Sequence, residues 1–180
     1  DMGTRALRGT MDITQMEVGA LLALANQREH RLTGQITSHV QLGGSLDNPS
    51  IALTGEIAEG TLASYPISDV AIDAALSDRV LTLRRLSGAQ GSGSFAASGM
   101  MDFDGAANLD FAASDIALGV FTRFAGIEEP VTGTASLTVH LGGSAQSPEA
   151  DAMITAKDGG VRSASFDEMA GEAELRGSVI

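Results

Sequence analysis

The chain has 180 residues, of which 43% are hydrophobic but only 4% aromatic, and it contains 22 glycines and no tryptophan. Its formal net charge of −12 at pH 7 argues against a nucleic-acid partner, because proteins that bind phosphate backbones cluster Lys and Arg on their surface. The absence of cysteine excludes a disulfide framework, a Cys-ligated zinc site and a thiol nucleophile.

The first predicted element is a helix. Thr14 and Glu17 have the spacing of a capping box. Apolar side chains then recur every four residues, at Met16, Ala20 and Leu24. We therefore predict an amphipathic helix over residues 14–26.

From residue 33 onward, apolar and polar residues alternate with a period of two, which is typical of half-buried strands. Turn residues separate the alternating runs, as at Gly43-Gly44-Ser45, Ser77-Asp78 and Asp104-Gly105. Strands joined by such short turns predict an antiparallel meander, so the fold is expected to be all-β apart from two short helices. One face of this sheet is expected to be apolar and the other hydrated.

The apolar face is the candidate functional site. Its expected members are Ile36, Val40, Leu42, Ile51, Leu53, Ile57, Val70, Ile72, Leu76, Leu81, Leu83, Phe95, Ala97, Met101, Phe103, Leu109, Phe111, Leu137, Val139, Leu141 and Ile154. Two interpretations stay open: the face packs against another sheet, or the sheet curls into an open trough whose occupant is not protein. Small residues at inward positions, among them Ala74, Ala97 and Ala135, favour the trough, because a dry protein core would need more bulk there.

A second helical segment is predicted at residues 119–125, directly before a repeat. The stretch TGQITSHVQLGGSLDNP at 33–49 returns as TGTASLTVHLGGSAQSP at 132–148, a shift of 132 − 33 = 99 residues without a gap. One copy spans about 14–112, and a second, incomplete copy spans about 119–180. A chain that reuses one long β-patterned unit is expected to stack its copies along an axis. Since the last residues have the pattern of an unfinished strand, we expect a fragment of a longer domain.

No residue pattern indicates catalysis. His39 and His140 fall on the polar strand face and His30 lies in a charged run, so all three are expected to be solvated. The glycine cluster at 88–93 lacks both phosphate-loop spacings, and no serine lies in a G-x-S-x-G turn. We therefore expect no enzyme, no metal and no cofactor. No apolar run reaches the roughly eighteen residues that a membrane-spanning helix needs.

Taken in order, the helical segment, TG, an alternating strand, LGGSxxxP, a second alternating strand and GSGSFAASGMMDFDG form a pattern that resembles a known family. It is similar to the C-terminal repeats of the TamB (translocation and assembly module) family, and more broadly to the AsmA-like, bridge-like lipid-transfer proteins. The resemblance covers about residues 10–180. It implies an elongated, curved β-sheet groove with an apolar interior, the fold called a β-taco.

The resemblance also implies a location and partners. The parent protein would be anchored in the inner membrane of a Gram-negative bacterium, cross the periplasm and contact an Omp85-type (TamA-like) outer-membrane barrel. The leading hypothesis is a non-enzymatic conduit that shields phospholipid acyl chains between the two membranes. The alternative is a scaffold that binds strands of outer-membrane proteins or autotransporters at an exposed sheet edge. A third interpretation is a structural spacer with a closed core.

Overall fold

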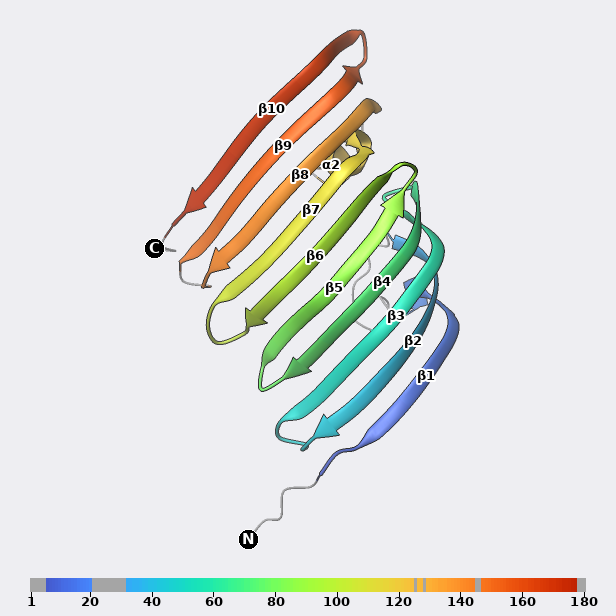
Figure 1. Cartoon of the computed structure of the whole chain (residues 1–180), viewed down its shortest axis with the longest axis vertical. Coiled ribbons are helices and arrows are strands. Elements are labelled where there is room, and N and C mark those ends of the chain that lie inside the picture. The colour runs from blue at the N-terminus through green and yellow to red at the C-terminus, as the bar shows by residue number, and fades with distance from the viewer. Residues whose placement is uncertain (1–5, 21–31, 125, 128, 145–146, 178–180) are drawn as a thin grey trace.

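Ten strands form one antiparallel sheet, in which each strand pairs with the strands next to it in sequence (Figure 1). The computed structural model describes residues 6–20, 32–124, 126–127, 129–144 and 147–177. The strands are β1 (Gly9–Glu17), β2 (Leu32–Gly44), β3 (Pro49–Leu62), β4 (Tyr65–Ser77), β5 (Val80–Gln90), β6 (Gly93–Asp102), β7 (Ala107–Ala117), β8 (Val131–Gly143), β9 (Pro148–Val161) and β10 (Ala164–Arg176), and helix α2 (Leu118–Phe124) joins β7 to β8. The predicted all-β fold and antiparallel meander are confirmed.

Tight turns connect β3 to β4 and β4 to β5, and the second of them follows the predicted break at Ser77-Asp78. Ala63 and Ser64, between β3 and β4, have φ angles of 52° and 75°, and Asp78 and Arg79, between β4 and β5, have φ angles of 50° and 62°. A positive φ at both central residues matches the twist of a two-residue hairpin. Such turns leave little freedom for the register, so each one fixes which side chains of the next strand share a face.

The first predicted helix is wrong over residues 14–17. β1 continues through Glu17 and pairs with β2, residues 18–20 are helical, and residues 21–26 lie outside the described residues. The cause is a bulge, because the register shifts between Ile13 and Met16 and Gln15 has a φ of 52°. The extra residue returns Met16 to the face of Ile13, and the resulting spacing of three residues imitates a helical period. The second predicted segment is confirmed over residues 119–124 as part of α2, and residue 125 lies outside the described residues.

The sequence repeat is also a structural repeat. β2 and β8 begin 131 − 32 = 99 residues apart and end 143 − 44 = 99 residues apart. The same shift separates β3 from β9 (148 − 49 = 99) and β4 from β10 (164 − 65 = 99). β7 precedes α2 and β8 as β1 precedes a helical turn and β2. The structural unit therefore comprises six strands, and β7 is the first strand of the second unit.

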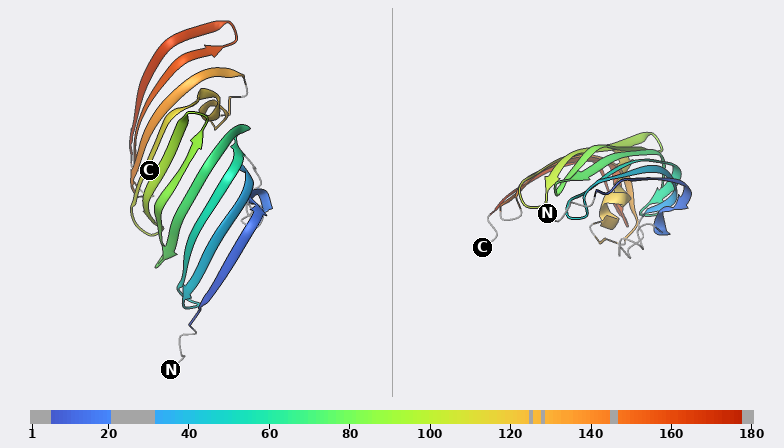
Figure 2. Two further views of the ribbon diagram at one scale, coloured as in Figure 1. Left: turned by 45° about the vertical axis from the view of Figure 1, so that its right-hand side comes forward. Right: turned by 90° about the horizontal axis from the view of Figure 1, so that it is seen from below.

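Bulges bend the sheet near the edge that carries α2. Asp69 in β4, Asp115 in β7 and Asp158 in β9 have φ angles of 53°, 52° and 49°, and the register shifts beside each of them. A bulge bends its strand and increases the local twist. In the right-hand view of Figure 2 the sheet forms an arch, and α2 lies on its hollow side.

The buried core is small and lies where the helical residues meet the sheet. Val18 packs with Ile57, Ile67 and Val70 in one cluster. Two further clusters lie at α2, and their buried members are Ala113, Ile116 and Val120 in one and Leu118, Ala135 and Ala156 in the other. The remainder of the sheet therefore depends mainly on its backbone ladder and on partly exposed cross-strand pairs for stability.

A glycine in β6 provides a test of how closely β6 and β7 lie together. Gly99 has a φ of 141°, and a Cβ atom added there would lie 2.1 Å from the carbonyl oxygen of Asn108 and 2.7 Å from the Cα of Leu109. Because both obstacles are backbone atoms, Gly99→Ala is expected to reduce the free energy of unfolding by about 3 kcal/mol. Urea denaturation followed by circular dichroism would measure the loss.

Gly171→Ala is the matched control, since the added methyl group would meet only Ile154 Cγ2 at an ordinary 3.5 Å. We expect its free energy of unfolding to stay within about 0.5 kcal/mol of the wild-type value. Equal urea midpoints for the two variants would contradict the strand arrangement at Gly99.

Candidate functional site: the apolar face of the sheet

Cross-strand pairing places the predicted apolar residues in rows that run across the strands. One row contains Leu42, Ile51, Leu76, Leu81 and Met101, each directly opposite the next. A second contains Val40, Leu53, Ala74, Leu83, Gly99, Leu109 and Leu141, and a third contains Ile72, Leu86, Ala97, Phe111 and Val139. Ile36, Ile57 and Val70 begin a fourth row, which Phe95, Ala113, Leu137 and Ile154 continue. Directly opposed residues point to the same side, so the rows form one apolar face.

The structure adds Leu86 to this face, a residue that the alternation of β5 did not predict. Leu83 pairs with Ala74 and Leu86 pairs with Ile72, because the register shifts between them. The two residues inside the shift, Arg84 and Arg85, are exposed on the other face. Two adjacent charged residues between two leucines are the sequence signal that could have revealed this bulge.

The prediction that Phe103 lies on a strand is wrong. β6 ends at Asp102, and Phe103 occupies the turn that follows, where it is 52% exposed. The strand ends because Asp102 Oδ1 accepts a hydrogen bond of 2.9 Å from the backbone N–H of Asp104. A side chain that satisfies the backbone two residues ahead favours a turn over a continued strand.

Much of the apolar face is open to solvent along the sheet. Ile51 is 37% exposed and Leu141 is 43% exposed, although both lie in these rows. Leu175 is 51% exposed, and its partner Ala150 pairs in turn with Leu141. On the polar face, by contrast, the large exposed hydrophobic residues among the described strand residues are Met100 and Met153. The sheet is the only β-layer in the described part of the chain. No second sheet in these residues covers the apolar face.

Helix α2 covers one end of the face. Leu118 and Val120 are buried, and Phe121 packs against both clusters at this end. The helix approaches β4 closely, because a Cβ atom added at Gly119 would lie 1.9 Å from the hydroxyl oxygen of Tyr65. The guanidinium carbon of Arg123 lies 6.0 Å from the centre of the same tyrosine ring, within reach of a cation–π contact. The apolar face therefore has a closed end beneath the helix and an open remainder.

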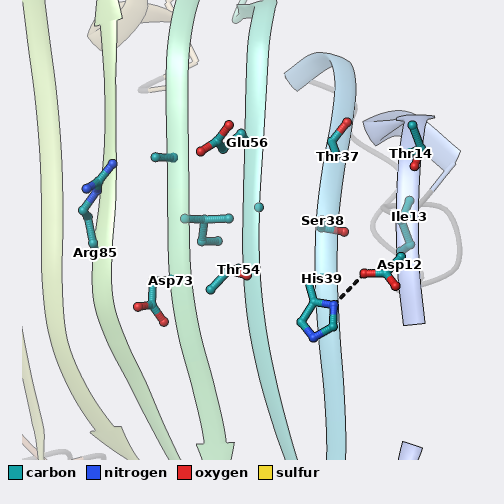
Figure 3. Close-up of a pocket in the computed structure, with 13 residues that line it drawn as sticks. Asp12, Ile13, Thr14, Thr37, Ser38, His39, Thr54, Glu56, Asp73 and Arg85 are labelled. Carbon is teal, nitrogen blue, oxygen red and sulfur yellow. Dashed lines mark hydrogen bonds and ion pairs between the residues drawn. The ribbon is translucent and has the colours of Figure 1, made fainter. Parts of the chain in front are cut away.

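The opposite face is polar and contains shallow hollows. One of them has a volume of about 430 Å³ and is lined by residues of β1 to β5. Figure 3 shows that the Asp12 carboxylate of β1 faces the His39 imidazole of β2 there. His39 Nδ1 lies 2.6 Å from Asp12 Oδ1, and His140 Nδ1 of β8 lies 2.8 Å from Asp110 Oδ1 of β7. The second ring nitrogen of His39 lies 3.3 Å from Gln41 Nε2. Within the described residues no group of three or more His, Asp or Glu side chains could hold a metal ion.

Ion pairs join the turns and the strands along the sheet. Arg79, in the turn between β4 and β5, donates a hydrogen bond of 2.9 Å to Asp104, in the turn between β6 and β7. This hydrogen bond lowers the pKa of Asp104 and raises the pKa of Arg79. On β10, the hydrogen bond to Asp151 of β9 raises the pKa of Arg176. All these groups are exposed to solvent: the Arg79–Asp104 pair joins the turns of two neighbouring hairpins, and the Arg176–Asp151 pair joins the two strands of one hairpin.

Comparisons with protein-family models, with curated proteins and with solved structures found no match to this chain. Among the described residues, neither helical segment has the length and hydrophobicity of a helix that crosses a bilayer.

The Arg79–Asp104 pair predicts a pH-dependent contribution to stability. Because the pKa of Asp104 is lower in the folded state, its contribution is complete above the unfolded pKa and is lost as the pH falls through the folded pKa. We expect Asp104→Asn to lower the urea midpoint at pH 7, and the difference between the two proteins to shrink as the pH falls below the unfolded pKa of about 3.9 and through the lower folded pKa. In the Asp104→Asn background, a further Arg79→Gln change should have almost no effect. A midpoint difference that persists undiminished in acid would contradict this assignment.

Proposed function

We propose that the apolar face binds phospholipid acyl chains and that the protein is a segment of a non-enzymatic lipid conduit. The observation that carries the proposal is one continuous apolar face, built from side chains of every strand, that stays partly exposed in the described residues. An acyl chain removes such a surface from water without requiring a specific polar partner.

Burial energetics favour an acyl chain as the occupant. A sixteen-carbon chain gains about 12 kcal/mol on leaving water, at about 0.8 kcal/mol per methylene. The rows contain no charged side chain, so a lipid tail that passes from one strand to the next desolvates no ion. Neighbouring strands lie about 4.8 Å apart, so movement along the rows divides into small steps of similar energy.

The charge of the protein suits a lipid that moves along the sheet. The net charge is −12, and acidic residues such as Asp12, Asp73 and Asp110 lie on the polar face. A phosphate headgroup gains little from an acidic surface, so it would remain in water at the rim while the acyl chains lie on the apolar face. Weak headgroup binding permits transport where strong binding would hold the lipid in place.

The sequence resemblance to the TamB family suggests the cellular setting that we propose. The parent protein would lie in the periplasm, anchored in the inner membrane, and would support outer-membrane biogenesis together with an Omp85-type barrel.

A second candidate function has support from one observation: β1 and β10 each have only one neighbouring strand among the described residues. Such edges could bind a strand of an outer-membrane protein or autotransporter during assembly, as a scaffold would.

A charge placed on the apolar face is expected to abolish lipid binding. Val139 lies between Phe111 and Ala152, and Val139→Asp forces a carboxylate either to lose its water or to admit water among the acyl chains. Because this costs several kcal/mol, we expect more than tenfold less phospholipid to co-purify with the variant in native mass spectrometry.

Thr138→Asp is the matched control, because Thr138 is the preceding residue of β8 and is exposed on the polar face. It introduces the same charge and should co-purify with as much phospholipid as the wild type. Thermal melts of both variants separate a loss of binding from a loss of folding. Equal lipid content in two folded variants would argue against a lipid-binding face.

Photo-crosslinking in cells distinguishes the conduit from the scaffold. A photo-reactive residue at Leu109 or Phe111 is expected to capture phospholipid, whereas the same residue at Asn108, which is exposed on the polar face, is not. Recovery of unfolded outer-membrane polypeptide alone from the apolar positions would support the scaffold. Recovery of other parts of the same chain alone would show that the face is an ordinary core.

A further inference from the structure

The strands run between two rims of the sheet, and the helical segments lie at one of them. The helix rim contains residues 18–20 after β1 and α2 after β7, together with the β3–β4 and β5–β6 turns. The hairpin rim contains the β2–β3, β4–β5, β6–β7 and β8–β9 turns, and none of its described residues is helical. In Figure 2, α2 lies on the hollow side of the arch. An occupant of the apolar face therefore meets a different boundary at each rim.

The exposure of the apolar face falls along β3 and β8 from the hairpin rim to the helix rim. On β8, Leu141 is 43% exposed, Leu137 is half-buried and Ala135 is 2% exposed. On β3, Ile51 is 37% exposed, whereas Ile57 is 5% exposed. These two strands belong to different repeat units, so the gradient is a property of the unit. The open part of the face begins at the hairpin rim and ends below the helical segments.

α2 forms a wall where the open part of the face ends. The half-buried Phe121 packs against both buried clusters at this helix. Phe111 and Ile154, two members of the apolar face, pack against the same clusters. Gly119 contacts Tyr65 at the start of β4, so the wall reaches from β4 to β8. The ring of Phe121 therefore lies between the open rows and the closed end of the face.

The distance from the hairpin rim to this wall matches the length of an acyl chain in a membrane. Leu141 and Leu137 are 141 − 137 = 4 residues apart on β8, which corresponds to about 14 Å at about 3.4 Å per residue. The hydrocarbon core of a bilayer is about 30 Å thick, so the acyl chains of one leaflet fill about 15 Å. An acyl chain that lies parallel to the strands fits between the hairpin rim and α2, whereas a longer chain meets Phe121.

Polarity assigns the headgroup to the hairpin rim. The turns there carry exposed polar side chains, among them Asn48, Asp78 and Asp104. At the helix rim, Ile116 is 4% exposed and Val120 is 3% exposed. A headgroup at the helix rim would have to enter these buried clusters and lose its water, which is costly for a charged group.

We propose that the apolar face takes lipids in one orientation, with the headgroup at the hairpin rim and the ends of the acyl chains against α2, and that Phe121 limits the length of chain that the face accepts. The proposal rests on the proposed binding of acyl chains and adds the orientation and the limit on length. Both helical segments lie at the same rim, so a lipid that moves along the rows keeps its orientation from one unit to the next.

A mixture of chain lengths tests the limit. Vesicles of phosphatidylcholine with saturated acyl chains of twelve to twenty-two carbons supply the lipids, and native mass spectrometry measures each bound lipid relative to its share of the mixture. Every methylene that stays in water lowers binding about fourfold. We therefore expect the wild-type protein to bind the twenty-two-carbon lipid at least tenfold less than the sixteen-carbon lipid. Equal binding of the two lipids would overturn the proposed limit.

Two substitutions should shift this limit in opposite directions. Phe121→Ala removes the wall, and we expect the bound ratio of twenty-two- to sixteen-carbon lipid to rise at least threefold. Ala152→Phe places a ring on the open part of the face, opposite Val139, and shortens the path from the hairpin rim. Its bound ratio of eighteen- to fourteen-carbon lipid should fall at least threefold. Because Ala152 is only half-buried, this variant tests the proposal even if Phe121→Ala does not fold.

Met153→Phe is the matched control for Ala152→Phe. Met153 is the next residue of β9 and is 59% exposed on the polar face, so its variant should keep the wild-type preference for chain length. An unchanged preference in a folded Ala152→Phe protein, or the same change in Met153→Phe, would overturn the proposal. Thermal melts establish that each variant is folded.

Photo-reactive lipids test the orientation directly. A diazirine at the end of the acyl chain is expected to label α2 and residues 135–137, whereas a diazirine beside the headgroup is expected to label residues 141–143. The reverse pattern, or equal labelling of both rims, would overturn the orientation and leave acyl-chain binding intact. A wild-type protein that binds no lipid would overturn the proposed function and this proposal together.

Discussion

The whole structure depends on one constraint: across ten consecutive strands, the apolar side chains must point to the same face of the sheet. Successive residues of a strand point to opposite faces, so a slip of one residue in any hairpin would move the apolar set of that strand to the wrong face. Tight turns with positive φ at residues 63–64 and 78–79 fix two of these registers. The result is a surface that no single strand could provide, because each row draws one side chain from each of several neighbouring strands.

Bulges and glycines shape this surface while the apolar side chains still point to the same face of the sheet. At Arg84 and Arg85 the extra residue is polar and points away, and the next leucine returns to the apolar face. Gly88 lies opposite Phe95, whose ring occupies the space that a Cβ atom would take, and Gly159 is covered in the same way by Phe166. An aromatic ring that covers a glycine on the neighbouring strand restores contact area where the strand has no side chain. Curvature and a continuous apolar surface are therefore compatible in one layer.

The sequence predicts most of the apolar face but not its irregularities. Residues such as Leu42, Ile51 and Leu76 follow a strict alternation between clear turn signals, and their pairing agrees with the expectation. The alternation fails at Leu86 and in β1, because a bulge changes the spacing from two residues to three, which is also a spacing of helices. The degree of exposure depends on curvature and on the position of α2, which are tertiary properties that no local pattern contains.

The repeat gives the molecule a unit of length. Six strands at a spacing of about 4.8 Å extend the sheet by about 29 Å, and the unit that does so is 99 residues long. Duplication of the unit would therefore lengthen the protein in fixed increments while the cross-section of the sheet, and the surface that any occupant meets, stays the same. In such a design the distance that a protein spans can evolve separately from what it binds, because the number of units sets the first and the composition of the rows sets the second.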